Sequence, residues 1–292
     1  MATPDTPRAG SSRSAPESGR LSINTATVRK QWTLAQIIEG CARHGIRGIA
    51  PWRDQIAEMG LVEAARAIEA HGLRVSGVCR GGMFPAPDAA GRNNALEDNL
   101  RAIEEAQRLG ADCLVMVVGG LPKDSKDIAG AREQVKEGLA ALLPHARAAG
   151  VPLAIEPLHP MYAADRACVN TLAQALDLCD AIDPQTSGAL GVAVDAYHVW
   201  WDPQLEAQIA RAGKSRLLAY HICDWLVPTR DLLNDRGMMG DGVIDLPKLR
   251  SRVERCGYAG MHEVEIFSEL DWWRRDPHEV LDTCVERHRS AS

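Results

Sequence analysis

From residue 21 onward, short apolar segments alternate with longer segments in which apolar residues recur at helical spacing. Each apolar segment has the length of a strand, and its apolar residues are mostly consecutive instead of alternating with polar ones. Consecutive apolar positions are typical of strands buried on both faces of a parallel sheet. Helical spacing marks residues 34–44, 96–109, 135–149 and 172–182. The predicted strands are 21–25, 48–51, 73–79, 113–118, 151–155, 190–194, 217–222 and 261–266.

Capping residues mark the ends of the predicted helices. A helix often ends on a residue with a left-handed backbone, which glycine adopts without steric cost. Asn170 and Asp245 are predicted N-caps of the helices at 171–182 and 246–256. The glycines that separate a helical segment from the next strand, and are predicted to end helices, are Gly45, Gly72, Gly110, Gly150 and Gly257.

Eight strand–helix units predict an α/β fold, a single-domain (β/α)8 TIM barrel over residues 21–292. Such barrels routinely use about 250 residues as one domain, so the length does not require a second one. An open doubly wound sheet would usually carry a glycine-rich phosphate loop after its first strand, and residues 23–26 contain no glycine. Residues 1–20 are rich in Ser, Pro, Ala and Gly, and we expect them to form a disordered tail.

Composition excludes several classes of partner. The net charge is −6 and the chain has no long basic run, so binding to nucleic acid is not expected. No segment approaches the roughly 20 consecutive apolar residues of a membrane span, and the N-terminus lacks the apolar stretch of a signal peptide. The eight cysteines form no Cys-x-x-Cys pair and are predicted to be free thiols. We therefore expect a cytoplasmic protein.

Acidic and imidazole side chains end four successive predicted strands. Glu156, Asp195 and His221 lie at the ends of three of them, and Glu263 and Glu265 lie at the end of the last. Active sites of α/β barrels form at the carboxyl ends of the strands, so these groups are expected to converge on one ring. Side chains repeat every two residues along a strand, so periodicity does not choose between the two glutamates.

Three carboxylates and one imidazole make a mixed oxygen and nitrogen donor set that suits one divalent metal ion. Mn²⁺ is the first choice, with Mg²⁺, Co²⁺, Fe²⁺ and Zn²⁺ as alternatives. Without an ion, the carboxylates would repel one another strongly. His198 lies three residues after Asp195, just outside the strand. We predict that it contacts substrate; the alternatives are that it supports a metal ligand or caps a helix.

Aromatic residues are scarce, and five or six of the seven tryptophans fall just after predicted strands. We expect them around the barrel mouth, where some would form a flat wall for a sugar-sized ligand and at least half would pack between loops. Arg53 and Arg80 follow two early strands, and each either meets an acidic or carbonyl-rich substrate or forms a salt bridge in the rim. The tryptophans after strands are Trp52, Trp200, Trp201, Trp225, Trp272 and Trp273.

Five motifs resemble the xylose isomerase-like TIM barrel superfamily, and within it the sugar phosphate isomerase/epimerase group. The resemblance covers about residues 21–288. It implies a metal held by Glu156, Asp195, His221 and Glu265, because the family's last ligand precedes a hydrophobic residue and a phenylalanine, as Glu265 does here. The motifs are IEPLHP (155–160), DAYH (195–198), HICD (221–224), RGMMGDG (236–242) and EVEIF (263–267).

The resemblance also implies roles for single residues. In ketose 3-epimerases the two glutamate ligands act as the acid/base pair, and here these are Glu156 and Glu265. Arg236 resembles an arginine that contacts substrate oxygens, whereas Tyr162 stands where the epimerases carry an acid. Members of the group often form dimers or tetramers, so a homodimer or homotetramer is expected. The candidate substrate-binding residues are His198, Arg236, Arg80, Trp200, Tyr162 and Asp224.

The leading hypothesis is a metal-dependent isomerase or epimerase that acts on a small hydroxy-ketone or keto-sugar through a metal-stabilised enediolate. The alternative is a metal-dependent lyase or dehydratase of a keto-sugar, keto-inositol or 3-keto-glycoside. A phosphodiesterase similar to endonuclease IV is disfavoured, because residues 51–53 and 79–81 lack the extra histidines of that enzyme's three-zinc cluster. A barrel that only binds sugar is disfavoured because all four predicted ligands are retained.

Overall fold

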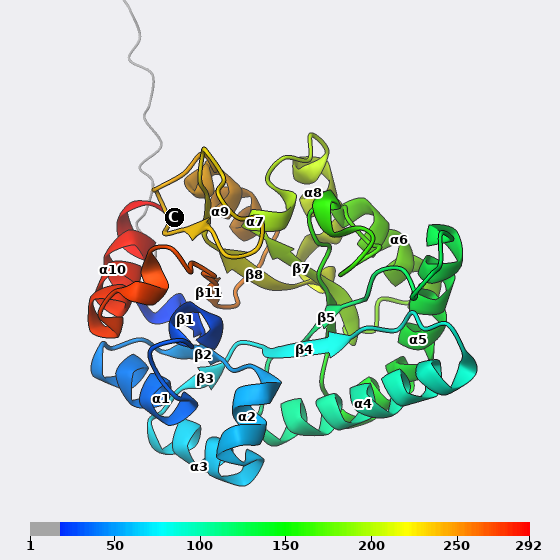
Figure 1. The fold of residues 1–292 in the computed structure, drawn as a ribbon, viewed down its shortest axis with the longest axis horizontal. Coiled ribbons are helices and arrows are strands. Elements are labelled where there is room, and N and C mark those ends of the chain that lie inside the picture. The colour runs from blue at the N-terminus through cyan, green and yellow to red at the C-terminus, as the bar shows by residue number, and fades with distance from the viewer. Residues whose placement is uncertain (1–17) are drawn as a thin grey trace, which may run out of the picture.

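The protein forms a closed ring of parallel strands surrounded by helices (Figure 1). The structure, a computed structural model, describes residues 18–292. Its main sheet has the strand order β3-β2-β1-β11-β8-β7-β6-β5-β4, and every neighbouring pair is parallel. The strands are β1 (Leu21–Asn24), β2 (Gly48–Ala50), β3 (Arg74–Val75), β4 (Val78–Gly82), β5 (Leu114–Val117), β6 (Leu153–Ile155), β7 (Leu190–Asp195), β8 (Leu217–Ile222) and β11 (His262–Val264).

The third strand of the barrel is divided into β3 and β4, which is why nine segments fill eight positions. β3 pairs with β2, whereas β4 pairs with β5. The ring closes where the Cys79 amide donates to the Pro51 carbonyl at 3.1 Å and Trp52 forms a parallel bridge with Cys79. The predicted (β/α)8 TIM barrel is therefore confirmed, with this one division inside the expected strand 73–79.

Helices cover the outside of the ring, and two of them begin earlier than the apolar spacing predicts. α4 and α5 were expected at 96–109 and 135–149, but each has two additional turns at its start. These turns are rich in small and polar residues, so apolar spacing does not mark them, and Asp88 and Asp127 cap them. The helices are α1 (Leu34–Arg43), α2 (Arg53–Met59), α3 (Leu61–Ala70), α4 (Ala89–Arg108), α5 (Ile128–Ala149), α6 (Leu172–Ile182), α7 (Ala196–Val199), α8 (Leu205–Arg216), α9 (Leu246–Arg255) and α10 (Pro277–Ser290).

The predicted caps are confirmed with one exception. Asp245 accepts from the Lys248 amide and caps α9. Asn170 was expected to cap α6, but the cap is Thr171, whose hydroxyl accepts from the Gln174 amide. The side-chain amide of Asn170 donates instead to two loop carbonyls, so the predicted cap was one residue too early. The glycines at helix ends all have positive φ: Gly45, Gly72, Gly110, Gly150 and Gly257.

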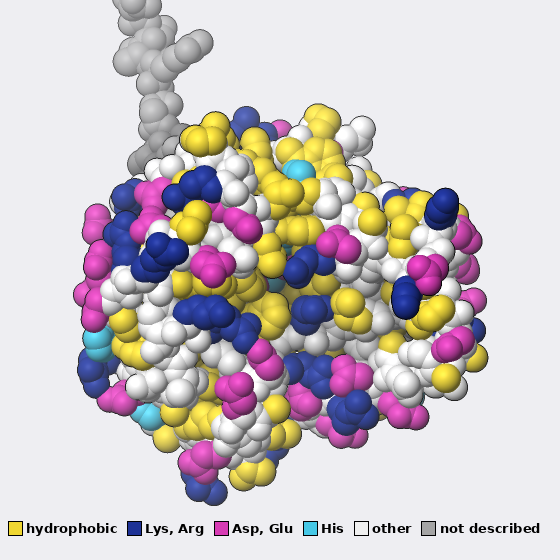
Figure 2. Space-filling view, viewed as in Figure 1, with side chains coloured by type: hydrophobic (Ala, Val, Ile, Leu, Met, Phe, Trp, Pro, Cys, Tyr) yellow, Lys and Arg dark blue, Asp and Glu magenta, His cyan; other side chains and the backbone are white. Residues whose placement is uncertain are grey.

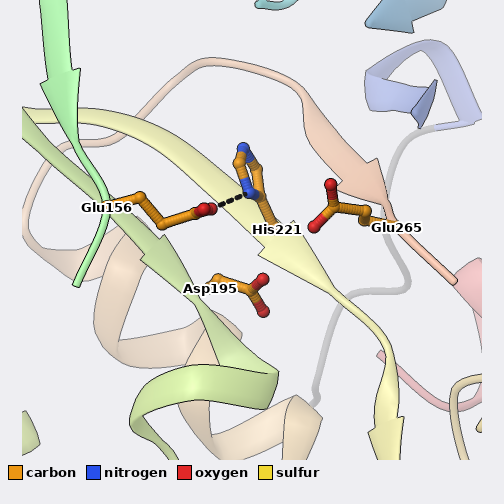
Figure 3. Close-up of side chains that lie close together, drawn as sticks. All are labelled: Glu156, Asp195, His221 and Glu265. Atoms are coloured by element: carbon orange, nitrogen blue, oxygen red, sulfur yellow. Dashed lines mark ion pairs between the residues drawn. The ribbon is translucent and has the colours of Figure 1, made fainter. Parts of the chain in front are cut away.

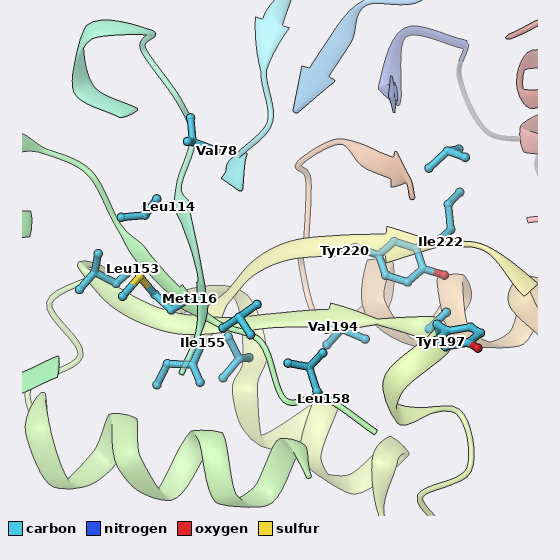
Figure 4. Packing of buried hydrophobic residues seen from close by; sticks show 14 of the residues in the cluster. Val78, Leu114, Met116, Leu153, Ile155, Leu158, Val194, Tyr197, Tyr220 and Ile222 are labelled. Atoms are coloured by element: carbon cyan, nitrogen blue, oxygen red, sulfur yellow. The ribbon is translucent and has the colours of Figure 1, made fainter. Parts of the chain in front are cut away.

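Alternate strand residues divide between two buried layers. Large side chains such as Leu114, Met116 and Ile155 pack in the main core cluster (Figure 4). The residues between them are small and form a second cluster, which includes Val115 and Ala154. Small side chains leave room inside the ring for polar groups, and the large ones supply most of the buried apolar area. Truncating one of the large residues to Ala would cost about 2–5 kcal/mol of stability.

Other predictions concern the termini and the cysteines. Ser18–Arg20 form a short 3-10 helix (η1), and Arg20 pairs with Glu254 at 3.0 Å, so the folded part begins before residue 21. The rest of the expected tail, residues 1–17, lies outside the described residues. All eight cysteines are free thiols, as predicted. Within residues 18–292, none of the helices is both long and apolar enough to cross a membrane.

Candidate functional site

Glu156, Asp195, His221 and Glu265 meet at the carboxyl ends of β6, β7, β8 and β11 (Figure 3). Each offers one ligand atom, and these four atoms all lie within 4.8 Å of one another. All four side chains are buried, although three are acidic. The arrangement follows from the fold, because parallel strands in a barrel deliver their last residues to the same edge.

Three atoms of this quartet are buried without a hydrogen-bond partner within residues 18–292: Glu156 Oε1 and both ring nitrogens of His221. His221 Nδ1 lies 2.8 Å from Glu156 Oε1, yet neither atom has a hydrogen bond within residues 18–292. Buried polar atoms are nearly always satisfied, because leaving one unpaired costs about 1–3 kcal/mol. A divalent cation would satisfy Glu156 Oε1 and His221 Nδ1, and carboxylate oxygens with one imidazole nitrogen are suitable ligands. The residues present therefore fit a metal ion.

Arg236 ties two of the carboxylates together. It extends from β10 (Arg236–Gly237), which pairs with β9 (Asp224–Trp225) in the loop after β8. Its Nη1 donates to Asp195 Oδ2 at 3.1 Å and to Glu265 Oε2 at 2.9 Å. Burial raises the pKa of Glu265 well above its usual range, and repulsion from Glu156 and Asp195 raises it further. The positive charge of Arg236 lowers this pKa, but by less than the other effects raise it. Glu265 therefore holds a proton at higher pH than an ordinary carboxyl group.

Glu263 lies on the other side of His221 from Glu156. Its Oε1 accepts from Asn24 Nδ2 and its Oε2 accepts from Ser76 Oγ, both at 2.8 Å. Its Oε1 also lies 3.5 Å from His221 Nε2. The two imidazole nitrogens thus face different glutamates, with Nδ1 toward the quartet and Nε2 toward Glu263. This geometry separates Glu263 from Glu265, which the spacing of residues along the strand did not.

A cavity of about 630 Å³ opens over the quartet. His198 lines it and is buried, with Nε2 3.1 Å from Arg236 Nη2. Burial lowers the pKa of His198 to about 3, and Arg236 adds to this shift although Asp195 opposes it. The imidazole is therefore neutral near pH 7, so it can exchange hydrogen bonds with a hydroxyl group without adding charge.

The cavity wall is partly aromatic. Tyr162 lines it and is nearly buried, and its hydroxyl donates to the Leu232 carbonyl at 2.6 Å. Trp52 and Trp273 also line it. Both pack edge-on against Phe267, at ring-centroid distances of 5.7 and 5.9 Å. Flat aromatic faces beside a polar floor are suited to a ligand of sugar size.

The family assignment rests on a comparison with protein-family models. The model described as xylose isomerase-like TIM barrel matches residues 38–284, which is most of the chain. The chain belongs to this family. The resemblance seen in the five motifs is thereby confirmed at the level of the superfamily.

Three relatives are informative. The structure of protein SMc04130 from Sinorhizobium meliloti 1021 is 63% identical, covers 94% of this chain and 99% of that chain, and has a TM-score of 0.91. An inosose isomerase from Bacillus velezensis is 24% identical over 283 residues, which are 91% of this chain and 95% of the relative. A crystal structure of IolI protein with a binding zinc atom is 20% identical, with a TM-score of 0.77 over 94% of this chain and 100% of that chain. At this identity the last comparison shows the shared fold alone.

Two predicted substrate contacts do not reach the cavity of this xylose isomerase-like barrel. Trp200 follows α7 and lies against Trp225 at a centroid distance of 5.7 Å, lining a separate hollow near α9. Asp224 is fully buried and accepts from the amides of Trp225, Gly240 and Ile244. Its carboxylate is therefore occupied in holding the loop after β8, and the structure does not bring either of these two residues to the cavity over the quartet.

The two strand-end arginines differ. Arg53 forms ion pairs with Asp98 at 2.8 Å and Glu105 at 2.6 Å and does not line the cavity. Arg80 does line it. For each arginine we expected either a substrate contact or a salt bridge in the rim, and the salt bridge is confirmed for Arg53. Most of the tryptophans after strands pack between loops as expected, since Trp52 and Trp273 alone among the six line this cavity.

Sequence reasoning missed Asn24, Ser76 and Arg166. Asn24 ends β1 and its amide donates to both Glu263 and Glu265, so the strand-end rule would have found it if applied to the first strand. Ser76 lies in the break between β3 and β4, which no apolar pattern reveals. Arg166 lines the cavity from the loop between β6 and α6, where strand ends give no guidance.

Proposed function

We propose that this protein is a divalent-metal-dependent isomerase or epimerase that acts on a small keto-sugar or related hydroxy-ketone. The observation that carries the proposal is the buried quartet with two unsatisfied ligand atoms at the floor of a cavity of about 630 Å³. The inosose isomerase relative and the zinc atom in the IolI structure support it. A cavity of this size accommodates a sugar-sized molecule and excludes much of the surrounding water.

Glu156, Asp195, His221 and Glu265 would hold the ion. When bound, a divalent ion would polarise the substrate carbonyl and stabilise the negative charge that develops as a proton leaves the neighbouring carbon. Mn²⁺ remains our expectation from the donor set, and the zinc in the IolI structure makes Zn²⁺ the first alternative to test.

Glu156 and Glu265 are proposed to move the proton. They extend from β6 and β11, which are separated in the ring by β7 and β8, so their carboxylates approach a substrate from two sides. Both carboxylates line the cavity, so each is placed to exchange a proton with a substrate bound there. If one glutamate removes the proton and the other returns it on the opposite face, the outcome is epimerisation. If one glutamate shuttles the proton between neighbouring carbons, the outcome is isomerisation.

Arg236 and His198 are proposed to orient these groups and the substrate. Arg236 Nη1 fixes the Asp195 and Glu265 carboxylates, and its Nη2 lies beside His198. The neutral imidazole of His198 lines the cavity, with Nδ1 accepting from the His159 amide at 3.3 Å and Nε2 beside Arg236, so a substrate hydroxyl group would share one of these nitrogens. Preorganised donors of this kind contribute because they need no rearrangement as charge develops.

The test is proton exchange in deuterium oxide, followed by NMR, with the zinc- or manganese-loaded protein and a panel of keto-sugars and keto-inositols. Deuterium incorporated at the carbon beside the carbonyl, without loss of water, supports the proposal. Release of water or of an aglycone would favour the lyase alternative instead.

Glu156→Gln should slow this exchange by about 10²–10⁴-fold, because general acid–base catalysis contributes that much. Glu97→Gln is the matched control, since Glu97 is exposed on α4 and does not line the cavity. Unchanged exchange in Glu156→Gln at equal metal content would contradict the acid/base assignment.

A further inference from the structure

The cavity over the quartet is lined by several cations, and they differ in whether an acid neutralises them. Arg29 pairs with Asp54, and Arg236 pairs with two of the carboxylates in the quartet. Arg80, Arg166 and Lys30 also line the cavity, and none of the three forms an ion pair with a carboxylate within residues 18–292. Among the cations of the lining, the unpaired charge is therefore on these three side chains; two acids of the same lining, Asp165 and Glu269, also form no ion pair within residues 18–292.

Arg80 is the member of this group that most needs a partner. It lies on β4 and is only partly exposed, and its side chain makes no hydrogen bond or ion pair with any other described residue. Burial lowers its pKa, and the positive charge of Arg166 lowers it further, while the nearby Glu156 opposes the shift. A guanidinium group stays charged under these conditions. Arg80 thus carries a partly desolvated positive charge in the cavity that Arg166 also lines.

Arg166 is held in position by an aromatic ring and not by an acid. Its guanidinium carbon lies 5.4 Å from the centre of the Tyr162 ring, and both residues line the cavity. Lys30 is placed in the same way over Trp273, at 5.6 Å. Stacking on a ring fixes a cation while leaving its N–H donors free. These donors are therefore available to a ligand.

The cations of the cavity lining contrast with the chain as a whole, whose net charge is −6. On the face shown in Figure 2, Lys and Arg side chains gather around a hollow near its middle. Two unpaired arginines in one partly buried cavity are unfavourable unless an anion neutralises them. Their planar donor groups match the oxygens of a carboxylate or a phosphate in a bidentate manner.

We propose that Arg80 and Arg166 bind an anionic group of the substrate, a carboxylate or a phosphate monoester, so that the substrate is an acidic keto-sugar and not a neutral one. The inference rests on the proposed function for the keto-sugar part, but the anion site is argued from the unpaired arginines alone. Arg80, Arg166, Glu156 and Glu265 line the same cavity, so an anionic group held by the arginines would place the rest of the substrate beside the quartet.

The direct test compares three compounds that share a six-carbon polyol chain: D-glucitol, which is neutral, D-gluconate, which has a carboxylate at C1, and D-glucitol 6-phosphate, which has a phosphate at C6. Their dissociation constants are measured by calorimetry on the zinc-loaded protein. At least one of the two anions should bind tenfold or more tightly than D-glucitol. The stronger of the two identifies the anion as carboxylate or phosphate.

The variants Arg80→Gln and Arg166→Gln should each weaken binding of that anion by about tenfold, the usual effect of one charge-assisted hydrogen bond. Binding of D-glucitol should not change. Arg66→Gln is the matched control, because Arg66 is exposed on α3 and does not line the cavity. Zinc content is checked in every sample, so that chelation of the metal by D-gluconate is not mistaken for binding. Equal affinity for all three polyols, or anion binding that survives both substitutions, overturns the inference.

Proton exchange separates this inference from the proposed function. If D-fructose exchanges as fast as D-fructose 6-phosphate and 5-keto-D-gluconate, the isomerase proposal stands and the anion site is wrong. If the anions bind through the two arginines but no keto-sugar exchanges, the anion site stands and the isomerase proposal is wrong. Exchange that is fast for one of the acidic keto-sugars and slowed in Arg80→Gln supports both.

Discussion

The two halves of the barrel mouth carry different kinds of side chain. The strands from β6 to β11 end in the quartet of three carboxylates and one imidazole. The strands from β1 to β4 carry other groups: the amide of Asn24 at the end of β1, the indole of Trp52 just after β2, and the guanidinium group of Arg80 within β4. One half can hold a cation, whereas the other can hold an apolar face and an anion. Because every strand ends at the same edge, a barrel can divide reaction chemistry from recognition by strand number.

Asn24 is where the two halves meet. Its side-chain nitrogen donates to Glu263 at 2.8 Å and to Glu265 at 3.0 Å, and its oxygen accepts from the Trp52 indole at 2.7 Å. A neutral amide can donate on one side and accept on the other, which a carboxylate cannot do. The position of the aromatic wall is thus linked to the position of a carboxylate of the quartet through one side chain.

The largest expected effect comes from emptying the metal-binding half. Treatment with a strong chelator should abolish proton exchange by about a thousandfold or more, since a metal contributes several kcal/mol of charge stabilisation. Added Zn²⁺ or Mn²⁺ should restore the native protein but not His221→Ala, which lacks the nitrogen ligand. Binding of the preferred anionic polyol by Arg80 and Arg166 should weaken less than exchange does. Undiminished proton exchange in the chelator-treated protein would contradict the assignment of metal chemistry to the half that carries the quartet.

The sequence was sufficient for the half that carries the quartet and insufficient for the other. Glu156, Asp195 and His221 each stand out because an ionisable residue directly follows or ends an apolar run, and a parallel barrel brings such residues together. Arg166 could not be found in this way, because its place depends on the path of a loop and on a stack against Tyr162. Asp224 was expected at the cavity, but strand-end position does not tell whether backbone amides already occupy a carboxylate, as they do here.

A similar limit applies to the elements themselves. Apolar spacing located the eight barrel strands, but it missed the first turns of α4 and α5, where polar residues face solvent and the caps Asp88 and Asp127 set the start. It also gave no sign of the break between β3 and β4, because Ser76 and Gly77 interrupt only two positions of an apolar run. The break matters for the site, since Ser76 donates to Glu263.

The next effect in size concerns Glu263, which supports the quartet without belonging to it. Glu263→Gln should weaken zinc binding by about 10–100-fold, because a carboxylate beside the second nitrogen of a histidine ligand orients the ring and raises its basicity. Competition with a coloured zinc chelator measures this directly, whatever the activity. Glu97→Gln again serves as the control on an exposed glutamate. Unaltered zinc affinity would mean that the 3.5 Å approach of Glu263 to His221 Nε2 has no part in holding the metal.

The smallest expected effect tests the link through Asn24. Trp52→Phe keeps an aromatic ring in the wall but removes the indole N–H that donates to Asn24 Oδ1. One lost hydrogen bond should lower the free energy of unfolding by about 0.5–1.5 kcal/mol, measured by urea denaturation. Trp32→Phe is the control, because Trp32 lies away from the cavity and its indole makes no hydrogen bond to another residue of the described chain. If the two halves are linked as the contacts indicate, Trp52→Phe should also weaken zinc binding by a few-fold while Trp32→Phe does not. Equal zinc affinity in both variants would show that the aromatic wall and the metal site, though joined by hydrogen bonds, are energetically independent.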